Sequence, residues 1–211
     1  MRIIISQLHI NKDGIVCKDK TGKDHVVFKK QGDLDGACAT YCVIMNLLIL
    51  RLIKDKDTRV YEESCDRATR KLIKTFLKDS GMHINGQSYF KIKRMLNTSF
   101  NKVDCIHYNS EGNRSLSYIE KNIIEDKPII ISISQKKWAH ALLAVGFEKE
   151  NEVISKIYCL DPSGEPCRNK RWNMEIEVKN SGLENRQLTI IYDGKYVSLD
   201  DVLIITEKNE S

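Results

Sequence analysis

Residues 31–50, QGDLDGACATYCVIMNLLIL, place two glycines, two aspartates and two cysteines directly before an almost unbroken apolar run. From Gly36 to about Lys54, apolar residues fall on nearly all faces of a helix, which is the pattern of a helix surrounded by protein. The run Tyr41–Leu50 has about half the length that spans a bilayer, and it contains Asn46. We therefore predict a buried central helix.

The two cysteines at the start of this helix have different surroundings. Cys38 lies at the expected N-terminus, with Asp35 or Gly36 as the capping residue, where free backbone N–H groups and the helix dipole favour a thiolate. Cys42 lies one turn further in, where burial raises the pKa of a thiol. Free cysteine is commonly a core residue, so both could be structural. If either is reactive, we expect it to be Cys38.

Composition narrows the class of protein. The 211 residues include 34 basic and 29 acidic side chains, a formal net charge of +5, with 41% hydrophobic and 30% charged residues. This balance is typical of a globular domain with a sizeable core. Basic clusters occur, but they lack any groove-reading or stacking motif, so we do not expect nucleic acid as a partner.

Cysteine usage points to a reducing compartment. The seven cysteines include no C-x-x-C pair, and the opening MRIIISQLHI is too short for the apolar core of a signal peptide and is typical of a strand. We expect free thiols and a cytoplasmic protein without a membrane partner.

Periodicity predicts one domain, 1–211, in three parts. Residues 1–30 form a β-hairpin region that turns at Thr21-Gly22, residues 31–127 are mainly helical, and residues 128–211 are mainly β. We predict an α+β fold in which a helical subdomain with a central buried helix packs against a mostly antiparallel β-sheet.

Further elements are expected within these parts. Helices are predicted at about 61–80, ending at Gly81, at 88–97, and at 116–125 after a Ser115 cap. Strands are predicted in VDCIHY, PIIISIS, HALLAVGFEKENEVISKIYCLD, QLTIIYDGKYVSL and DVLIITE. A turn at Asp193-Gly194 divides QLTIIYDGKYVSL into a hairpin.

A histidine and an aspartate flank two neighbouring predicted strands. In WAHALLAVGFEKENEVISKIYCLDPSG (138–164), His140 begins one strand and Asp161 ends the next. With a turn near Glu150 and Asn151, antiparallel pairing makes His140 and Asp161 direct cross-strand neighbours. The carboxylate would then accept the Nδ1–H of the imidazole and leave Nε2 for a thiol.

The other histidines carry weaker signals. His107 alternates with Cys105 in VDCIHY, but two ligands fall short of the four that a structural zinc needs. His9, His25 and His83 lie in polar segments typical of a surface. We expect neither a metal nor a cofactor.

Three further positions have both a functional and an ordinary interpretation. Gln31 precedes Cys38 by seven residues, and its side-chain N–H₂ could join the Cys38 backbone N–H in binding an oxyanion, or it could be a surface loop residue. Trp138 could line a substrate pocket or belong to the core. Asp33 and Asp35 could select a basic substrate residue, or simply form a turn and a cap.

With Gln31, Cys38, His140 and Asp161 in this order, the chain resembles the papain-like cysteine peptidase superfamily. It looks closest to small bacterial peptidases of the bacteriocin-processing type, and HALLAVGF and LDPSG are similar to segments common there. The resemblance covers about residues 31–164.

The resemblance implies a function. Cys38 would attack a peptide or isopeptide bond, His140 would move the proton, Asp161 would orient His140, and Gln31 would help to bind the oxyanion. The substrate would be a protein or peptide, and a regulatory protein partner is a further expectation. The same residues could serve a thiol acyltransferase, transglutaminase or deamidase, or stand in an inactive binding module.

Overall fold

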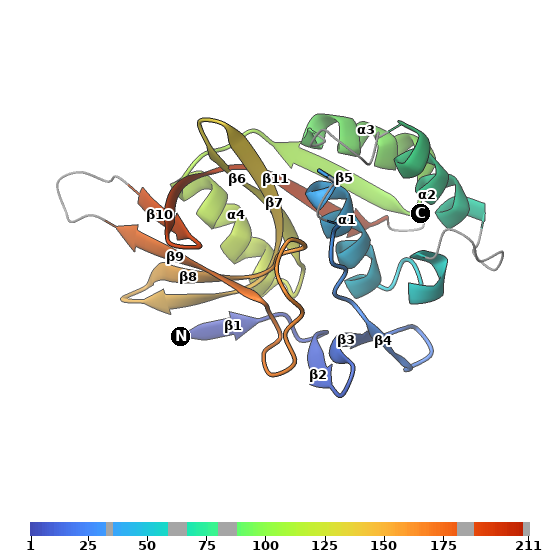
Figure 1. Cartoon of the computed structure of the whole chain (residues 1–211), viewed down its shortest axis with the longest axis horizontal. Coiled ribbons are helices and arrows are strands. Elements are labelled where there is room, and N and C mark those ends of the chain that lie inside the picture. The colour runs from blue at the N-terminus through green and yellow to red at the C-terminus, as the bar shows by residue number, and fades with distance from the viewer. Residues whose placement is uncertain (33–35, 59–66, 80–87, 181–187, 209–211) are drawn as a thin grey trace.

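The apolar helix α1 (Cys38–Ile49) lies in the middle of the molecule, between a β-barrel and a group of helices (Figure 1). The computed structural model describes residues 1–32, 36–58, 67–79, 88–180 and 188–208. Every residue of α1 except Tyr41 is buried. The prediction of a central buried helix is confirmed.

The remaining elements occupy the chain on both sides of α1. The strands are β1 (Arg2–Ile4), β2 (His9–Asn11), β3 (Gly14–Lys18), β4 (Asp24–Val26), β5 (Val103–Tyr108), β6 (Ile129–Gln135), β7 (Trp138–Glu150), β8 (Val153–Leu160), β9 (Met174–Asn180), β10 (Leu188–Tyr192) and β11 (Lys195–Glu207). The helices are α2 (Arg67–Asp79), α3 (Tyr89–Ser99) and α4 (Asn113–Ile124), with a 3-10 turn, η1 (Asp55–Thr58). Within the described ranges, no helix combines the length and apolar character needed to cross a membrane.

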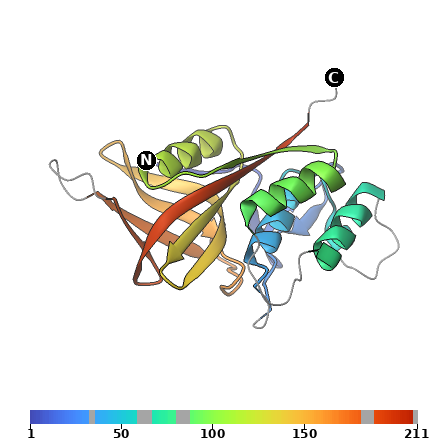
Figure 2. The same cartoon turned by 90° about the horizontal axis from the view of Figure 1, so that it is seen from above.

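Six antiparallel strands close into a barrel in the order β7-β6-β11-β10-β9-β8, with β8 returning to β7. Strand β1 pairs with the second half of β7, and β2, β3 and β4 form a separate small sheet. Strand β11 continues beyond the barrel and pairs with β5 on the side of α3, as Figure 2 shows. Of the described residues, 40% are in strands and 28% in helices, so the protein is mostly β.

The predicted fold, a papain-like α+β arrangement of a helical subdomain on an antiparallel sheet, is therefore wrong. The prediction missed β9, which pairs with both β8 and β10 and so closes the sheet. In MEIEVKN (174–180) apolar and charged residues alternate, which is a strand pattern. An open sheet has two edge strands with unpaired backbone groups. Closure into a barrel pairs each of these six strands on both sides.

Two hairpin predictions are confirmed. Strands β3 and β4 pair across the turn that contains Thr21-Gly22, and β10 and β11 pair across Asp193-Gly194. In the second turn both residues have positive φ, 48° and 70°, which matches the twist of the strands that they join. The residue types in the two turns were therefore sufficient to predict both hairpins.

Other local predictions need correction. The segments KYVSL and DVLIITE form one strand, β11, with an irregularity between Leu199 and Val202. Helix α4 begins after Gly112, and Ser115 lies inside it, where its hydroxyl donates to the carbonyl of Asp200 (2.7 Å). The start of the predicted helix 61–80 and its C-cap Gly81 lie outside the described residues.

Close approach of two strands excludes a side chain at Gly146. This residue of β7 pairs with Ile4 of β1. A Cβ atom there would lie 2.7 Å from the carbonyl oxygen of Ile3 and 2.9 Å from Cγ1 of Ile4. The first of these atoms belongs to the backbone, so β1 would have to move.

We expect Gly146→Ala to lower the free energy of unfolding by about 1–3 kcal/mol, the usual cost of overpacking. Urea denaturation measures this change. The control Ala139→Ser, at an exposed position of the same strand, should change stability by no more than about 0.5 kcal/mol. Equal free energies of unfolding for Gly146→Ala and the wild type would contradict this, because they would show that β1 can move away from β7 without loss of stability.

Candidate active site

Helix α1 presents Cys38 at its first position. The N-cap is Ala37, not Asp35 or Gly36 as expected, and it makes no side-chain hydrogen bond to the first turn. The first turn also lacks an acidic residue. The positive end of the helix dipole at this N-terminus favours a thiolate at Cys38. Asp33 and Asp35 lie outside the described residues.

The backbone of β7 holds both cysteines of α1. The N–H of Ala141 donates to Cys38 Sγ, and the carbonyl of Ala141 accepts from Cys42 Sγ, each at 3.4 Å. Burial raises the pKa of the Cys38 thiol, but a hydrogen bond and the charge of His140, with the N–H groups of Ala141 and Ala39, lower it below its ordinary value. Burial raises the pKa of Cys42 far above its ordinary value.

His140 connects Cys38 to Asp161. Its Nε2 lies 2.8 Å from Asp161 Oδ1, and the side chains of His140 and Asp161 are 11% and 1% exposed. Burial alone would lower the pKa of His140, but Asp161 and Cys38 raise it to about 9. Burial raises the pKa of Asp161, yet His140 and other donors bring it below its ordinary value. These directions favour a thiolate, an imidazolium and a carboxylate.

The proximity of His140 and Asp161 was predicted, but two details of the prediction are wrong. The turn lies at Asn151-Glu152, one residue later than expected, and β7 pairs Leu143 with Leu160. Continuing this register places Asp161 opposite the residue two positions after His140, on the same face of β7, so the carboxylate approaches diagonally. The ring also meets it through Nε2 and not through Nδ1 as predicted.

Three further residues hold Asp161 in place, and the sequence pointed to only one of them. Oδ1 accepts from the backbone N–H of Ser163 (2.8 Å), and Oδ2 accepts from the hydroxyl of Tyr192 (2.7 Å). Asn173 accepts from the Asp161 N–H (2.7 Å) and donates to its carbonyl (2.9 Å). Ser163 belongs to the DPSG turn, which was a signal, but Tyr192 and Asn173 reach the site only because β9 and β10 complete the barrel.

Gln31 lies beside the segment that follows Asp161. Its backbone N–H donates to the carbonyl of Pro162 (2.8 Å), and the residue is half-buried. The structure thus brings Cys38, His140 and Asp161 together and places Gln31 beside Pro162, the residue after Asp161, through its backbone. An oxyanion role for Gln31 stays a prediction.

Aromatic rings border the imidazole. The ring centroid of Tyr192 lies 6.0 Å from that of His140 and 6.2 Å from that of Trp138. Trp138 is half-buried, and its Nε1 donates to Gln135 Oε1 (3.0 Å). Trp138 therefore lies on the rim of the site rather than deep in the core.

A second thiol–imidazole pair lacks the properties of the first. Cys17 Sγ lies 3.1 Å from His25 Nε2, so His25 is half-buried and not the surface residue expected. Burial raises the pKa of Cys17 to about 12 and lowers that of His25, which keeps both groups neutral. Nδ1 of His25 has no hydrogen-bond partner among the described residues, whereas His140 is bonded to the carboxylate of Asp161.

The described histidines other than His140 and His25 each pair with an aspartate. His107 pairs with Asp201 (2.9 Å) and His9 with Asp24 (3.0 Å), while burial raises the pKa of Cys105 to about 12. No cluster of three or more metal-ligating side chains occurs among the residues that the structure describes. His83 lies outside them.

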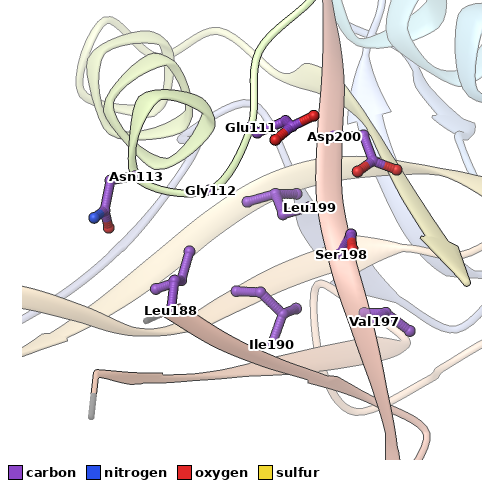
Figure 3. A pocket seen from close by; sticks show the side chains of 9 residues that line it. All are labelled: Glu111, Gly112, Asn113, Leu188, Ile190, Val197, Ser198, Leu199 and Asp200. Carbon is purple, nitrogen blue, oxygen red and sulfur yellow. The ribbon is translucent and has the colours of Figure 1, made fainter. Parts of the chain in front are cut away.

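A separate pocket of about 390 Å³ lies between the start of α4 and strands β10 and β11 (Figure 3). Its lining combines aliphatic and polar side chains: Glu111, Gly112, Asn113, Leu188, Ile190, Val197, Ser198, Leu199 and Asp200. None of the four predicted site residues lines this pocket.

No model of a known protein family matches the chain, and a comparison with curated proteins finds no significant match.

The rate of Cys38 alkylation should fall as the pH is lowered, and this part of the pH profile is its acid limb. We expect Tyr192→Phe to move the acid limb to higher pH. Loss of the hydroxyl removes a donor that stabilises ionised Asp161, so the pKa of Asp161 rises and the imidazolium loses its counter-charge at a higher pH. A hydrogen bond to a charged group of about 1.5 kcal/mol or more corresponds to about one pH unit. The rate of alkylation by iodoacetamide, measured against pH, tests this.

The matched control is Tyr196→Phe. Tyr196 is 73% exposed on β11, so its substitution should leave the acid limb in place. An unshifted limb in Tyr192→Phe would show that this tyrosine does not support Asp161.

Proposed function

We propose that the protein is a cysteine-dependent acyl-transfer enzyme that hydrolyses peptide or isopeptide bonds. One observation carries the proposal: at the N-terminus of α1, Cys38 Sγ accepts from the backbone N–H of Ala141, the residue after His140, and His140 is hydrogen-bonded to the buried carboxylate of Asp161. The pKa values of these three groups are shifted toward the ionised thiol, the protonated imidazole and the carboxylate. A nucleophile, a proton carrier and an orienting group are what thiol acyl transfer requires.

In the proposed reaction, the thiolate of Cys38 bonds to the substrate carbonyl carbon, and the carbonyl electrons move to its oxygen. The imidazolium of His140 then gives its proton to the leaving amine as the carbon–nitrogen bond breaks, which leaves a thioester. His140 next takes a proton from water, whose oxygen attacks the thioester and releases the acid. Asp161 keeps the imidazole oriented throughout, and the backbone N–H of Cys38, with Gln31, binds the oxyanion.

The order of these residues along the chain resembles that of papain-like peptidases, and this resemblance is part of the proposal. The papain-like fold is not part of it, because the chain forms a closed barrel. The proposal also includes a protein or peptide substrate and a cytoplasmic location. The six cysteines in the described part of the chain are all free thiols, which supports a reducing compartment.

Selective alkylation tests the reactive thiol. At pH 6.5 we expect iodoacetamide to label Cys38 about tenfold or more faster than the other cysteines, because its pKa is lowered while burial raises that of Cys17, Cys42 and Cys105. His140→Ala should remove the advantage. Mass spectrometry of the labelled peptides gives the rates.

Cys167 provides the internal reference, because it is a more accessible free thiol than Cys38. Labelling of Cys38 no faster than that of Cys167 would contradict the proposal and favour an inactive binding module.

A second measurement separates hydrolysis from transfer. We expect p-nitrophenyl acetate to acetylate Cys38 with a burst of p-nitrophenolate, and water then to release acetate, whereas Cys38→Ser should give no burst. Added glycinamide competes with water for the thioester. Acetylglycinamide as the main product would replace the hydrolase proposal with an acyltransferase.

A further inference from the structure

The pocket between the start of α4 and the β10–β11 hairpin has an aliphatic base (Figure 3). Ile190 pairs with Val197, so these two side chains share one face of the hairpin. Leu188 and Leu199 lie two residues further along the two strands, on the same face, because side chains alternate along a strand. Ile190 and Leu199 are each 2% exposed, and Leu188 and Val197 are half-buried. The base of the pocket is therefore apolar.

The rim of the pocket has two carboxylates. Glu111 directly precedes the N-cap of α4, and Asp200 belongs to β11. In Figure 3 the carboxylate of Glu111 lies above Leu199, and that of Asp200 lies on the other side of β11. The remaining polar residues of the lining, Asn113 and Ser198, are neutral, and none of the described lining residues is basic. The lining thus has a negative formal charge that no cation within it balances.

The backbone near these carboxylates is fixed, while the charged groups stay available. Asp200 and Asp201 lie in the irregularity of β11, and such irregularities often redirect side chains next to a site. Asp201 pairs with His107 (2.9 Å), whereas Asp200 is held only through its carbonyl, which accepts from the Ser115 hydroxyl (2.7 Å). Within the described part of the chain, the carboxylates of Asp200 and Glu111 make no hydrogen bond or ion pair. Both can therefore take a cation from outside.

We propose that this pocket binds a primary ammonium group on an aliphatic chain. The chain lies on Ile190 and Leu199, and the ammonium meets the carboxylates of Glu111 and Asp200. Burial of methylene groups supplies most of the affinity, and the carboxylates select the sign of the charge. A volume of about 390 Å³ lies within the usual range for small-molecule sites. This binding does not use Cys38, so it is independent of the proposed hydrolysis.

An NMR titration of the isotope-labelled protein with hexylamine tests the proposal. We expect the backbone amide signals of Gly112, Ile190 and Leu199 to shift, and that of Ala141, beside Cys38, to stay. Hexanoate, which has a chain of similar length and the opposite charge, should bind about tenfold more weakly or less. Each methylene group removed from the amine, down to propylamine, should weaken binding by about threefold.

Substitution of the carboxylates tests their part in binding. Glu111→Gln and Asp200→Asn should each weaken the binding of hexylamine by about threefold to fivefold, as expected for an exposed ion pair, and leave the binding of hexanol unchanged. Because these carboxylates bond to no described residue, both variants should keep the Tm of the wild type. The matched control is Glu150→Gln, which removes the same charge at an exposed position of β7 outside the pocket and should not change the affinity.

Two sources can supply such an ammonium group: a free alkylamine, or the side chain of a lysine in a partner protein. Nα-acetyl-lysine methylamide separates them, because it places the same group on a short piece of backbone. Binding of this compound at the affinity of hexylamine supports a lysine of a partner protein. Binding of hexylamine alone supports a free alkylamine.

Four results would overturn the proposal. Equal or tighter binding of hexanoate would mean that the N-terminus of α4 selects the ligand. An affinity that does not depend on chain length would mean that amines only pair with surface carboxylates. Unchanged affinity in both carboxylate variants would exclude the ion pairs, and shifts confined to residues around Cys38 would place the amine at the proposed active site.

Discussion

The candidate site depends on one peptide unit of β7, that of Ala141. Its N–H donates to Cys38 and its carbonyl accepts from Cys42, so one residue of the barrel fixes two successive turns of the central helix. Because His140 directly precedes Ala141, the same contact brings the imidazole to the first thiol. The two cysteines need opposite protonation states. Cys42 must keep its proton to donate, and in the proposed reaction Cys38 must lose its proton to attack.

Barrel closure gives Asp161 its surroundings. The aspartate follows β8, and its neighbours arrive from the two strands that complete the barrel: Asn173 just before β9, and Tyr192 at the end of β10. Tyr192 donates to the carboxylate, which is 1% exposed and also bonds to His140 and to the Ser163 N–H, whereas Asn173 fixes the backbone of Asp161. The long-range pairing of strands is therefore a condition for the charge at the site, and not only for the shape of the protein.

Sequence reasoning succeeded where a local pattern determines the result. The all-round apolar run predicted α1, and Asp193-Gly194 predicted a hairpin. The pairing of His140 with Asp161 was predicted despite a wrong register, because an error of two residues keeps a side chain on the same face of a strand. The barrel, Tyr192, Asn173 and the use of Nε2 were not predicted, since each depends on contacts between segments far apart in the chain. The alternating pattern of β9 was present, but nothing local indicated which strands it would join.

Strand β11 also bears on how the two sides of the molecule can move. It is hydrogen-bonded to β6 and β10 in the barrel, and from Val202 to Glu207 it is hydrogen-bonded to β5, against which α3 packs. At Val202 and Leu203 it pairs with β6 and β5 at once. A rigid-body hinge between the barrel and the α3 side would have to break this shared ladder. Any opening toward Cys38 is therefore expected from side chains and short loops, on faster timescales than domain motion.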